Sequence, residues 1–374
     1  MSKKAKLIIA NSENCSDLYW ATRFFVPDPI IFFEIGGKKR LIASDLEYGR
    51  AKKEASVDQV ISYSQYQKKL RRNGANKIQE LDILDALLKE ERVREIEVPS
   101  YFPIRYAEAL RQRKYRLRPL PDPFFPERQF KTKAEKNEIV KSLRATERAI
   151  QFAIETIQKT RVRSKKLYLG GTVLTSELLR KMMELKMMEE GYLGRHTIVA
   201  CGRQAADPHC IGTGPLYANQ SIVLDVFPKS TKSGFYGDIS RTVIKGRASD
   251  RLKEMYHAVQ SAQKKGISMI RHRIDGSKVH QAVQQTMESK GFRTGYRNGR
   301  PEGFIHSTGH GLGLDIHEPP RISRLPEILK KGTVVTVEPG LYYEKIGGIR
   351  IEDVVYVTEK GCEVLTKLPR QFEV

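Results

Sequence analysis

Cysteine is scarce in this chain, and its four cysteines show no paired spacing. They are Cys15, Cys201, Cys210 and Cys362, with no Cys-x-x-Cys motif among them. In a chain of 374 residues this predicts reduced thiols and no disulfide framework. Cys201 and Cys210 lie near His209 in the sequence. Because no second pair of ligands lies nearby, we interpret them as semi-buried thiols and not as a zinc site.

Long apolar runs are also absent. The longest candidate, residues 29–35, is far shorter than the roughly 18 residues that span a membrane, and it contains Glu34. The N-terminal lysines precede an apolar stretch that ends at Ala10, which makes a poor signal peptide. Short-period repeats and low-complexity tracts are lacking as well. We therefore expect a soluble, cytoplasmic protein that has no membrane partner.

Acidic residues are outnumbered by basic ones, so that the formal net charge is +22. The excess is spread along the chain, which is typical of a solvated surface. One local cluster, Arg111 to Arg118, holds a single aromatic residue, Tyr115, where a single-strand binding platform would want several. No helix-turn-helix, zinc-finger or RNA-binding signature accompanies the charge. We predict no specific nucleic-acid partner, and any non-specific binding should collapse as salt rises.

The length favours about two domains. Residues 1–125 alternate short apolar runs with stretches of helical character such as 78–88, which predicts a small α/β domain. Three prolines follow within residues 118–123 and predict a linker or an extended arm. The remaining chain, residues 132–374, is the second predicted domain.

Long helices and strands characterise residues 132–374. Thr132 and Glu135 form a capping box at the start of a helix whose apolar residues recur at helical spacing to Ile157, with Thr146 as a polar exception. Further helices are predicted at 176–190, 250–271 and 277–290, and strands at 221–227, 236–245, 332–338 and 348–358. This pattern predicts an α+β domain with a largely antiparallel sheet.

Four acidic residues lie inside sequences that favour burial. Asp225 lies in an apolar strand, Asp238 follows Phe235-Tyr236-Gly237, Glu338 ends the run 334–337, and Glu352 lies within 349–355. A buried carboxylate without a partner is strongly unfavourable. Any one of these acids alone would be explained by a salt bridge or a strand edge. Four of them in one half of the chain predict a shared cation or metal.

Histidines gather in one glycine-rich segment. Residues 306–318 hold three of the eight histidines, His306, His310 and His317, together with three glycines. Glycine permits sharp turns and close approach to a ligand, and imidazole binds metals and carries protons near neutral pH. A solvated polar loop is the alternative interpretation. One imidazole with four carboxylates suits a pair of Mn²⁺, Co²⁺ or Zn²⁺ ions, which would readily deprotonate a water between them.

These residues and their order resemble the superfamily of methionine aminopeptidases, aminopeptidases P and prolidases, whose catalytic domain has the pita-bread fold. The resemblance covers about residues 132–374. It implies that two divalent ions, with Mn²⁺ expected and Co²⁺ or Zn²⁺ as alternatives, are held by Asp225, Asp238, His310, Glu338 and Glu352. It also implies that His209 faces the substrate, that His317 stabilises the reacting peptide, and that His306 lies in the active site.

The proline-directed branch of the superfamily is the closest in pattern. Residues 348–353, Gly-Ile-Arg-Ile-Glu-Asp, resemble the signature Gly-(Val/Ile)-Arg-Ile-Glu-Asp of that branch. Residues 1–125 resemble, more weakly, its creatinase-like N-terminal domain, which helps close the active site across a dimer, so we expect a homodimer. Two features depart from the pattern. Phe227 replaces the usual glycine two residues after Asp225, and Asp238 follows Asp225 by 13 residues, which we interpret as a longer hairpin loop.

The implied reaction is hydrolysis of an N-terminal Xaa-Pro bond, in a dipeptide or a longer peptide, by a metal-bridging hydroxide. Glu338 would act as general base, and His317 and His209 would stabilise the intermediate or the leaving nitrogen. Arg350 would orient Glu352 or neighbouring groups, bind a substrate carboxylate, or form a structural ion pair with a buried acid. Three alternatives stay open: a metal-free creatinase-like hydrolase, a binding protein for nucleic acid or protein that has lost the metals, and a methionine-type aminopeptidase. The N-terminal domain argues against the last.

Overall fold

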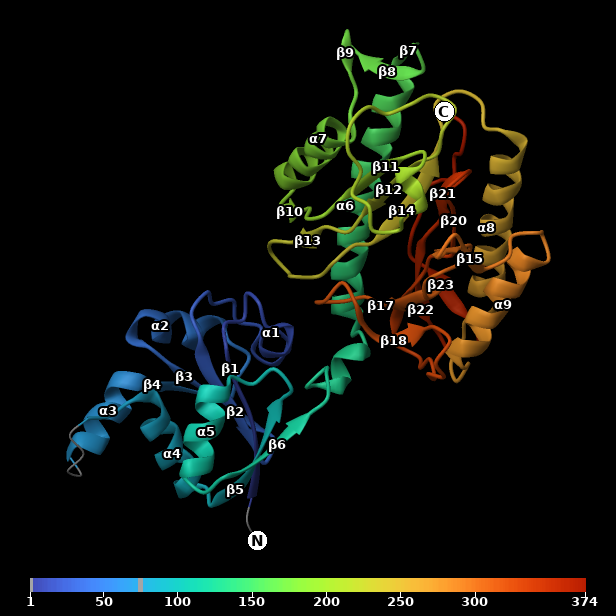
Figure 1. Cartoon of the computed structure of the whole chain (residues 1–374). Helices are drawn as coiled ribbons and strands as arrows, with labels where there is room; N and C mark the ends of the chain where they lie inside the picture. Colours follow the sequence, from blue (N-terminus) through green and yellow to red (C-terminus); the bar gives the residue numbers. More distant parts are fainter. Residues whose placement is uncertain (1–2, 73–76) are drawn as a thin grey trace. The chain divides into compact units, whose positions relative to one another are not determined.

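The computed structural model of this chain describes residues 3–72 and 77–374. It forms two compact units, Met1–Arg128 and Gln129–Val374, which are described separately below (Figure 1). Each unit has hydrophobic clusters of its own. Within the described ranges, no helix has both the length and the apolar character needed to cross a membrane.

The N-terminal unit is built on one mixed sheet with strand order β4-β3-β2-β1-β5-β6. β1 pairs antiparallel with β2 and parallel with β5. The strands are β1 (Lys3–Ala10), β2 (Ile30–Ile35), β3 (Lys38–Ala43), β4 (Gln59–Ser62), β5 (Val93–Pro99) and β6 (Arg116–Leu120). The helices are α1 (Ser16–Thr22), α2 (Asp45–Glu54), α3 (Tyr63–Arg72), α4 (Glu80–Glu90) and α5 (Ile104–Gln112), followed by the 3-10 turn η1 (Pro126–Gln129).

Both faces of this sheet are covered. Along β1, Leu7 and Ile9 pack into one hydrophobic cluster, whereas Ile8 points to the opposite face and packs into another. This confirms the α/β character predicted for the N-terminal region. The predicted linker at residues 118–123 is wrong in part, since β6 continues to Leu120. Pro119 is compatible with this strand because β6 forms an edge of the sheet, where a missing N–H group is tolerated.

The C-terminal unit combines long helices with small sheets whose named strands all pair antiparallel. The helices are α6 (Lys133–Gln158), α7 (Ser176–Glu189), α8 (Asp250–Met269) and α9 (Gly276–Glu288), with the 3-10 turn η2 (Gln204–Ala206). Two sheets matter most for the site, with orders β11-β12-β14 and β18-β17-β19-β22-β23. Their strands are β11 (Ile198–Cys201), β12 (Ile222–Val226), β14 (Ile239–Val243), β17 (Gly309–Gly311), β18 (Glu318–Ile322), β19 (Val334–Val337), β22 (Asp353–Val357) and β23 (Cys362–Val364).

The remaining strands form short ribbons around these sheets. They are β7 (Arg161–Arg163), β8 (Lys166–Leu169), β9 (Thr172–Val173), β10 (Tyr192–Leu193), β13 (Lys229–Ser230), β15 (Gly295–Arg297), β16 (Arg300–Glu302), β20 (Gly340–Tyr343) and β21 (Gly347–Arg350). Helices α8 and α9 run beside each other along one side of the unit (Figure 1). Their apolar residues pack against strands β20 and β21 in one cluster.

The four predicted helices of this unit occur within about two residues of their predicted ends. The predicted strand at 348–358 is wrong as a single element, because β21 ends at Arg350 and β22 begins at Asp353 in a different sheet. At the break, the backbone N–H of Ile351 donates to the carbonyl of Pro339 (3.4 Å) and that of Glu352 to the carbonyl of Ser240 (3.1 Å). The break brings Glu352 beside Ser240 of β14.

Candidate active site

One cavity of the C-terminal unit gathers all the side chains singled out in the sequence. Its volume is about 480 Å³. The predicted residues that line it are Asp225, Asp238, His310, Glu338, Glu352, His209, His306, His317 and Arg350. They come from different sheets and from loops far apart in the chain, so only the fold brings them together.

Asp225 is held by a buried arginine. It lies in β12, the central strand of its sheet, where it pairs with Ile198 of β11 and Ser240 of β14. The Nη2 group of Arg350 donates to Oδ2 of Asp225 at 2.5 Å, and Nε of Arg350 donates to the hydroxyl of Ser240 at 3.0 Å. With Arg350 only 4% exposed, this charge-assisted bond fixes the Asp225 carboxylate in one orientation.

Asp238, His310 and Glu352 form the tightest group in the cavity. Each offers a ligand atom, and these atoms all lie within 4.8 Å of one another. All three residues are buried. Oε2 of Glu352 accepts a hydrogen bond from Ser240 (3.0 Å), but its Oε1 is buried and has no hydrogen-bond partner in the part of the chain that the structure describes. A buried carboxylate oxygen left this way is strongly unfavourable unless a cation binds it.

The charges in the cavity point to the same conclusion. Burial, followed by repulsion from neighbouring carboxylates, raises the pKa of both Asp238 and Glu352 well above the usual range. A bound cation would remove that repulsion and keep both groups ionised. Oxygen donors with one imidazole nitrogen form a donor set that suits Mn²⁺, Co²⁺ or Zn²⁺, so the residues present fit a divalent metal.

Glu338 lies beside this group, directly after β19. Its Oε1 is 3.2 Å from Nε2 of His310 and accepts a hydrogen bond from Thr336 (3.2 Å). Its backbone N–H donates to the carbonyl of Thr308 (2.8 Å), which holds Glu338 beside the residue that precedes β17. Burial opposes ionisation of Glu338, but the hydrogen bond with His310 and the positive groups nearby outweigh burial and lower its pKa. Glu338 is therefore a carboxylate that faces the cavity in ionised form.

Tyr342 links His306 to Arg350 through two hydrogen bonds. Nδ1 of His306 donates to the carbonyl of Ser307 (2.7 Å), so in the neutral ring Nε2 accepts from the hydroxyl of Tyr342 (3.0 Å). That hydroxyl in turn accepts from Nη1 of Arg350 (2.9 Å). Burial is the main cause that lowers the pKa of His306, which favours this neutral form.

The other two histidines occupy the open side of the cavity. His317 is exposed and its ring meets that of His310 edge to face, with 4.3 Å between the centroids. Partial burial, followed by the nearby His310, lowers the pKa of His317. His209 is also exposed and lies in a turn where its backbone N–H donates to Asp207 (3.1 Å). Both imidazoles are placed to reach a ligand in the cavity.

Helix α6 sets the position of Asp238. The hydroxyl of Ser142 donates to the carbonyl of Phe235 (3.0 Å), and Thr146 lies against Gly237. These contacts explain why Thr146 interrupts the apolar stripe of α6. A Cβ on Gly237 would come within 2.4 Å of Oγ1 of Thr146 and 2.7 Å of the backbone of Ser142, so only glycine fits before Asp238.

We expect Gly237→Ala to displace Asp238 and to lower the free energy of unfolding by about 1–3 kcal/mol, the usual effect of overpacking. Metal affinity, measured by titration calorimetry, should fall with it. Gly295→Ala is the matched control, because its Cβ would meet nothing within 4 Å. Equal stability and metal affinity in the two variants would contradict this account of α6.

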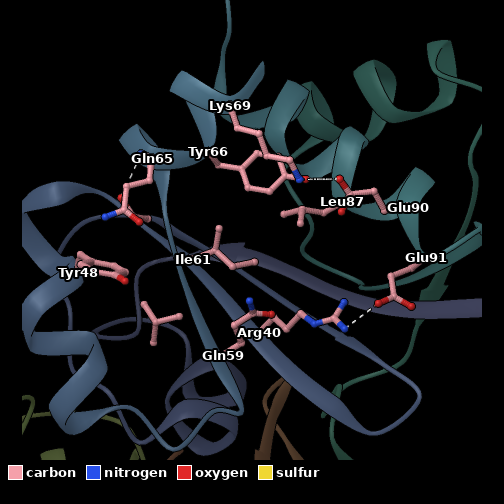
Figure 2. A pocket seen from close by; sticks show the side chains of 12 residues that line it. Arg40, Tyr48, Gln59, Ile61, Gln65, Tyr66, Lys69, Leu87, Glu90 and Glu91 are labelled. Carbon is pink, nitrogen blue, oxygen red and sulfur yellow. Dashed lines mark hydrogen bonds and ion pairs between the residues drawn. The ribbon is translucent and has the colours of Figure 1, made fainter. Parts of the chain in front are cut away.

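A second cavity, of about 520 Å³, lies in the N-terminal unit beside β3, β4, α3 and α4 (Figure 2). Its charged groups pair with one another: Lys69 with Glu90 at 3.1 Å and Arg40 with Glu91 at 2.7 Å. The hydroxyl of Tyr66 also donates to Glu90 (2.7 Å). Histidine is missing from its lining residues, and its carboxylates are already neutralised, so the C-terminal cavity is the candidate site.

Sequence reasoning missed several residues that shape the site. Ser240 and Tyr342 hold the predicted residues in place, and Ile198 and Arg321 line the cavity. A signal existed for Ser240, since it lies two residues after Asp238 and alternation along a strand places such residues on one face. Tyr342 has no such signal, because its partners His306 and Arg350 lie in other segments.

Comparisons with known proteins agree with this geometry. The model of "Metallopeptidase family M24" matches residues 137–359, more than half of the chain. An Xaa-Pro dipeptidase of Pyrococcus furiosus is 32% identical over 248 residues, which are 65% of this chain and 64% of that protein. An Xaa-Pro dipeptidase of Pyrococcus horikoshii is 27% identical over 341 residues, 90% of this chain and 86% of that protein.

A solved structure described as an X-Pro aminopeptidase of Thermotoga maritima is also similar. It superposes with a TM-score of 0.80 at 26% identity, covering 100% of this chain and 98% of that one. The fold is thus prolidase-like, with an N-terminal α/β unit and a C-terminal pita-bread domain, as predicted. Divalent metal ions are implied by the matching family, and the Asp238, His310 and Glu352 group is suited to hold one. The chain belongs to metallopeptidase family M24.

Proposed function

We propose that this protein is an exopeptidase that uses two divalent metal ions to hydrolyse N-terminal Xaa-Pro bonds. The observation that carries the proposal is the convergence of four carboxylates and one imidazole in one cavity, with the ligand atoms of Asp238, His310 and Glu352 within 4.8 Å of one another. Proline specificity is supported by the printed names of the similar proteins, Xaa-Pro dipeptidases and an X-Pro aminopeptidase.

Five residues would hold the metals: Asp225, Asp238, His310, Glu338 and Glu352. Two divalent ions, Mn²⁺ first among the candidates, would supply a nucleophile at neutral pH and polarise the scissile carbonyl. In this role Glu338 would accept the proton of the attacking water and return it to the leaving nitrogen. The exposed imidazoles of His317 and His209 would donate hydrogen bonds to the peptide as charge develops on it.

Arg350 is assigned to positioning in this proposal. Its guanidinium donates to Asp225, Ser240, Tyr342 and the carbonyl of Pro208. Little donor capacity is left for a substrate carboxylate, because these four bonds use most of its N–H groups. The structural ion pair considered from the sequence is therefore the role that the contacts favour, with Asp225 as the acid.

A different arginine is better placed to meet a substrate carboxylate. Arg321 lines the cavity near His317 and is exposed. Among the residues that the structure describes, no acidic side chain pairs with its guanidinium. A dipeptide carries its carboxylate one residue after the scissile bond, whereas a longer peptide carries it farther away. This arrangement favours dipeptides as substrates within the Xaa-Pro class.

The proposal predicts metal-dependent hydrolysis of Ala-Pro. Protein reloaded with Mn²⁺ should bind about two ions per chain by elemental analysis. It should turn over Ala-Pro faster than Ala-Pro-Ala, and Met-Ala much more slowly than either. Chelator treatment should remove both metal and activity, and Mn²⁺ should restore them. Absence of stoichiometric metal after reloading would refute the dinuclear site. Preference for Met-Ala would instead favour a methionine-type aminopeptidase.

A further inference from the structure

One wall of the active-site cavity is apolar and adjoins the proposed metal ligands. Ile198 pairs with Asp225 in neighbouring strands, so their side chains share one face of the sheet. Phe227 follows Asp225 by two residues and lies just beyond the end of β12. All three residues line the cavity. The aromatic ring and the Ile198 side chain therefore share the cavity with the Asp225 carboxylate, which has Ile198 as its cross-strand neighbour.

Other lining residues of the cavity differ in chemistry and origin. Ile316 and His317 lie just before β18, and Arg321 lies within it. Two of these three side chains are able to donate hydrogen bonds or carry charge, and they suit the side of a substrate that bears the carboxylate. The cavity thus combines polar and apolar lining residues.

We propose that Phe227 and Ile198 form the subsite for the side chain of the first substrate residue and make a large apolar residue preferred there. This rests on the proposed function. In an exopeptidase of this type the attacked carbonyl and the free amino group both belong to the first residue, so that residue lies against the metal ligands. Its side chain then projects onto the wall next to Asp225, which consists of Phe227 and Ile198.

The cavity is large enough to hold a small peptide substrate beside the Phe227 ring. About 480 Å³ remain with the Phe227 ring in the wall, which is within the range of small-molecule sites. Phe227 is half-buried, so part of its side chain is open to a ligand in the cavity. Apolar contact of this kind discriminates between substrates that differ in side-chain size by roughly 10–200-fold for each methylene-sized step.

The test compares wild type, Phe227→Ala and Phe227→Leu, each loaded with Mn²⁺. For each protein, kcat/KM is measured on Gly-Pro, Ala-Pro, Leu-Pro and Phe-Pro. We expect wild type to favour Leu-Pro over Gly-Pro in kcat/KM by at least about tenfold. Phe227→Ala should remove most of that ratio, and Phe227→Leu should retain part of it. Lys232→Ala, an exposed residue of the same hairpin that does not line the cavity, should leave the ratio unchanged.

Two kinetic results would overturn the subsite. An unchanged ratio in Phe227→Ala would show that the ring does not contact the first residue. A gain on Leu-Pro and Phe-Pro would show that the ring blocks large residues. Gly-Ala, Leu-Ala and Phe-Ala are run in parallel to separate this test from the proposed function. If only these proline-free dipeptides are hydrolysed, proline specificity is contradicted, but the ratio of kcat/KM for Leu-Ala to that for Gly-Ala still tests the subsite. If neither series is turned over, binding of leucine against glycine by calorimetry decides, and equal binding rejects the subsite.

Discussion

Replacing Glu338 with glutamine is expected to lower kcat by at least about 10²-fold, the usual worth of general-base assistance. Glutamine keeps the shape of the side chain and its hydrogen bond from Thr336, but it cannot accept a proton and it contributes no negative charge. The carboxylate lies 3.2 Å from Nε2 of His310, inside the group of proposed ligands. Both losses act at the reacting centre, so the effect on kcat should far exceed any effect on folding.

Three measurements are needed on this variant: kcat on Ala-Pro, metal content after Mn²⁺ reloading, and the thermal midpoint. Glu359→Gln is a suitable control, because Glu359 is 62% exposed in a surface pair with Lys331. Activity above about a tenth of wild type in Glu338→Gln would contradict the assigned role. Full metal content with lost activity would identify proton transfer as the dominant contribution.

The helices of the C-terminal unit were predictable because their signals are local. A capping box at Thr132 and Glu135, followed by apolar residues at helical spacing, fixes α6 from the sequence, and the structure shows both reciprocal hydrogen bonds (2.9 and 3.2 Å). The break between β21 and β22 was not predictable. It depends on bonds from Ile351 and Glu352 to Pro339 and Ser240, and such partners cannot be identified from one segment.

In the site, too, local features were predictable and long-range contacts were not. Each carboxylate could be recognised from its apolar sequence surroundings, and the order of the carboxylates allowed a family resemblance to be stated. Which atoms approach one another was not recognisable. The role favoured for Arg350 followed only when its four acceptors were known, and the place of Phe227 followed only when it was found to line the same cavity as Ile198 and Asp225. Local patterns thus suggest the chemistry, whereas the positions of individual side chains follow only from long-range contacts.

A buried charge network behind the site leads to the second large effect. Arg241 is 2% exposed, and its Nη2 group donates to Oδ1 of Asp353 (2.8 Å) and to the carbonyl of Leu368 (2.7 Å). Oδ2 of Asp353 accepts from Nε2 of Gln263 (2.9 Å) and from Arg370. Asp353 therefore forms ion pairs with two arginines and ties the C-terminal segment to the strand that follows Glu352.

We expect Asp353→Asn to lower the free energy of unfolding by about 3–5 kcal/mol, because removal of one partner leaves a buried arginine uncompensated. Nη1 of Arg241 also donates to the carbonyl of Glu352, so metal affinity should fall together with stability. Glu254→Gln provides the comparison: Glu254 forms an exposed helical pair with Arg251, and its loss should change stability by less than about 1 kcal/mol. Denaturant unfolding of the metal-free protein measures the change in the free energy of unfolding. Calorimetric titration with Mn²⁺ measures the change in metal affinity. A loss below about 1 kcal/mol in Asp353→Asn would mean that the network is no stronger than a surface pair and does not support Glu352.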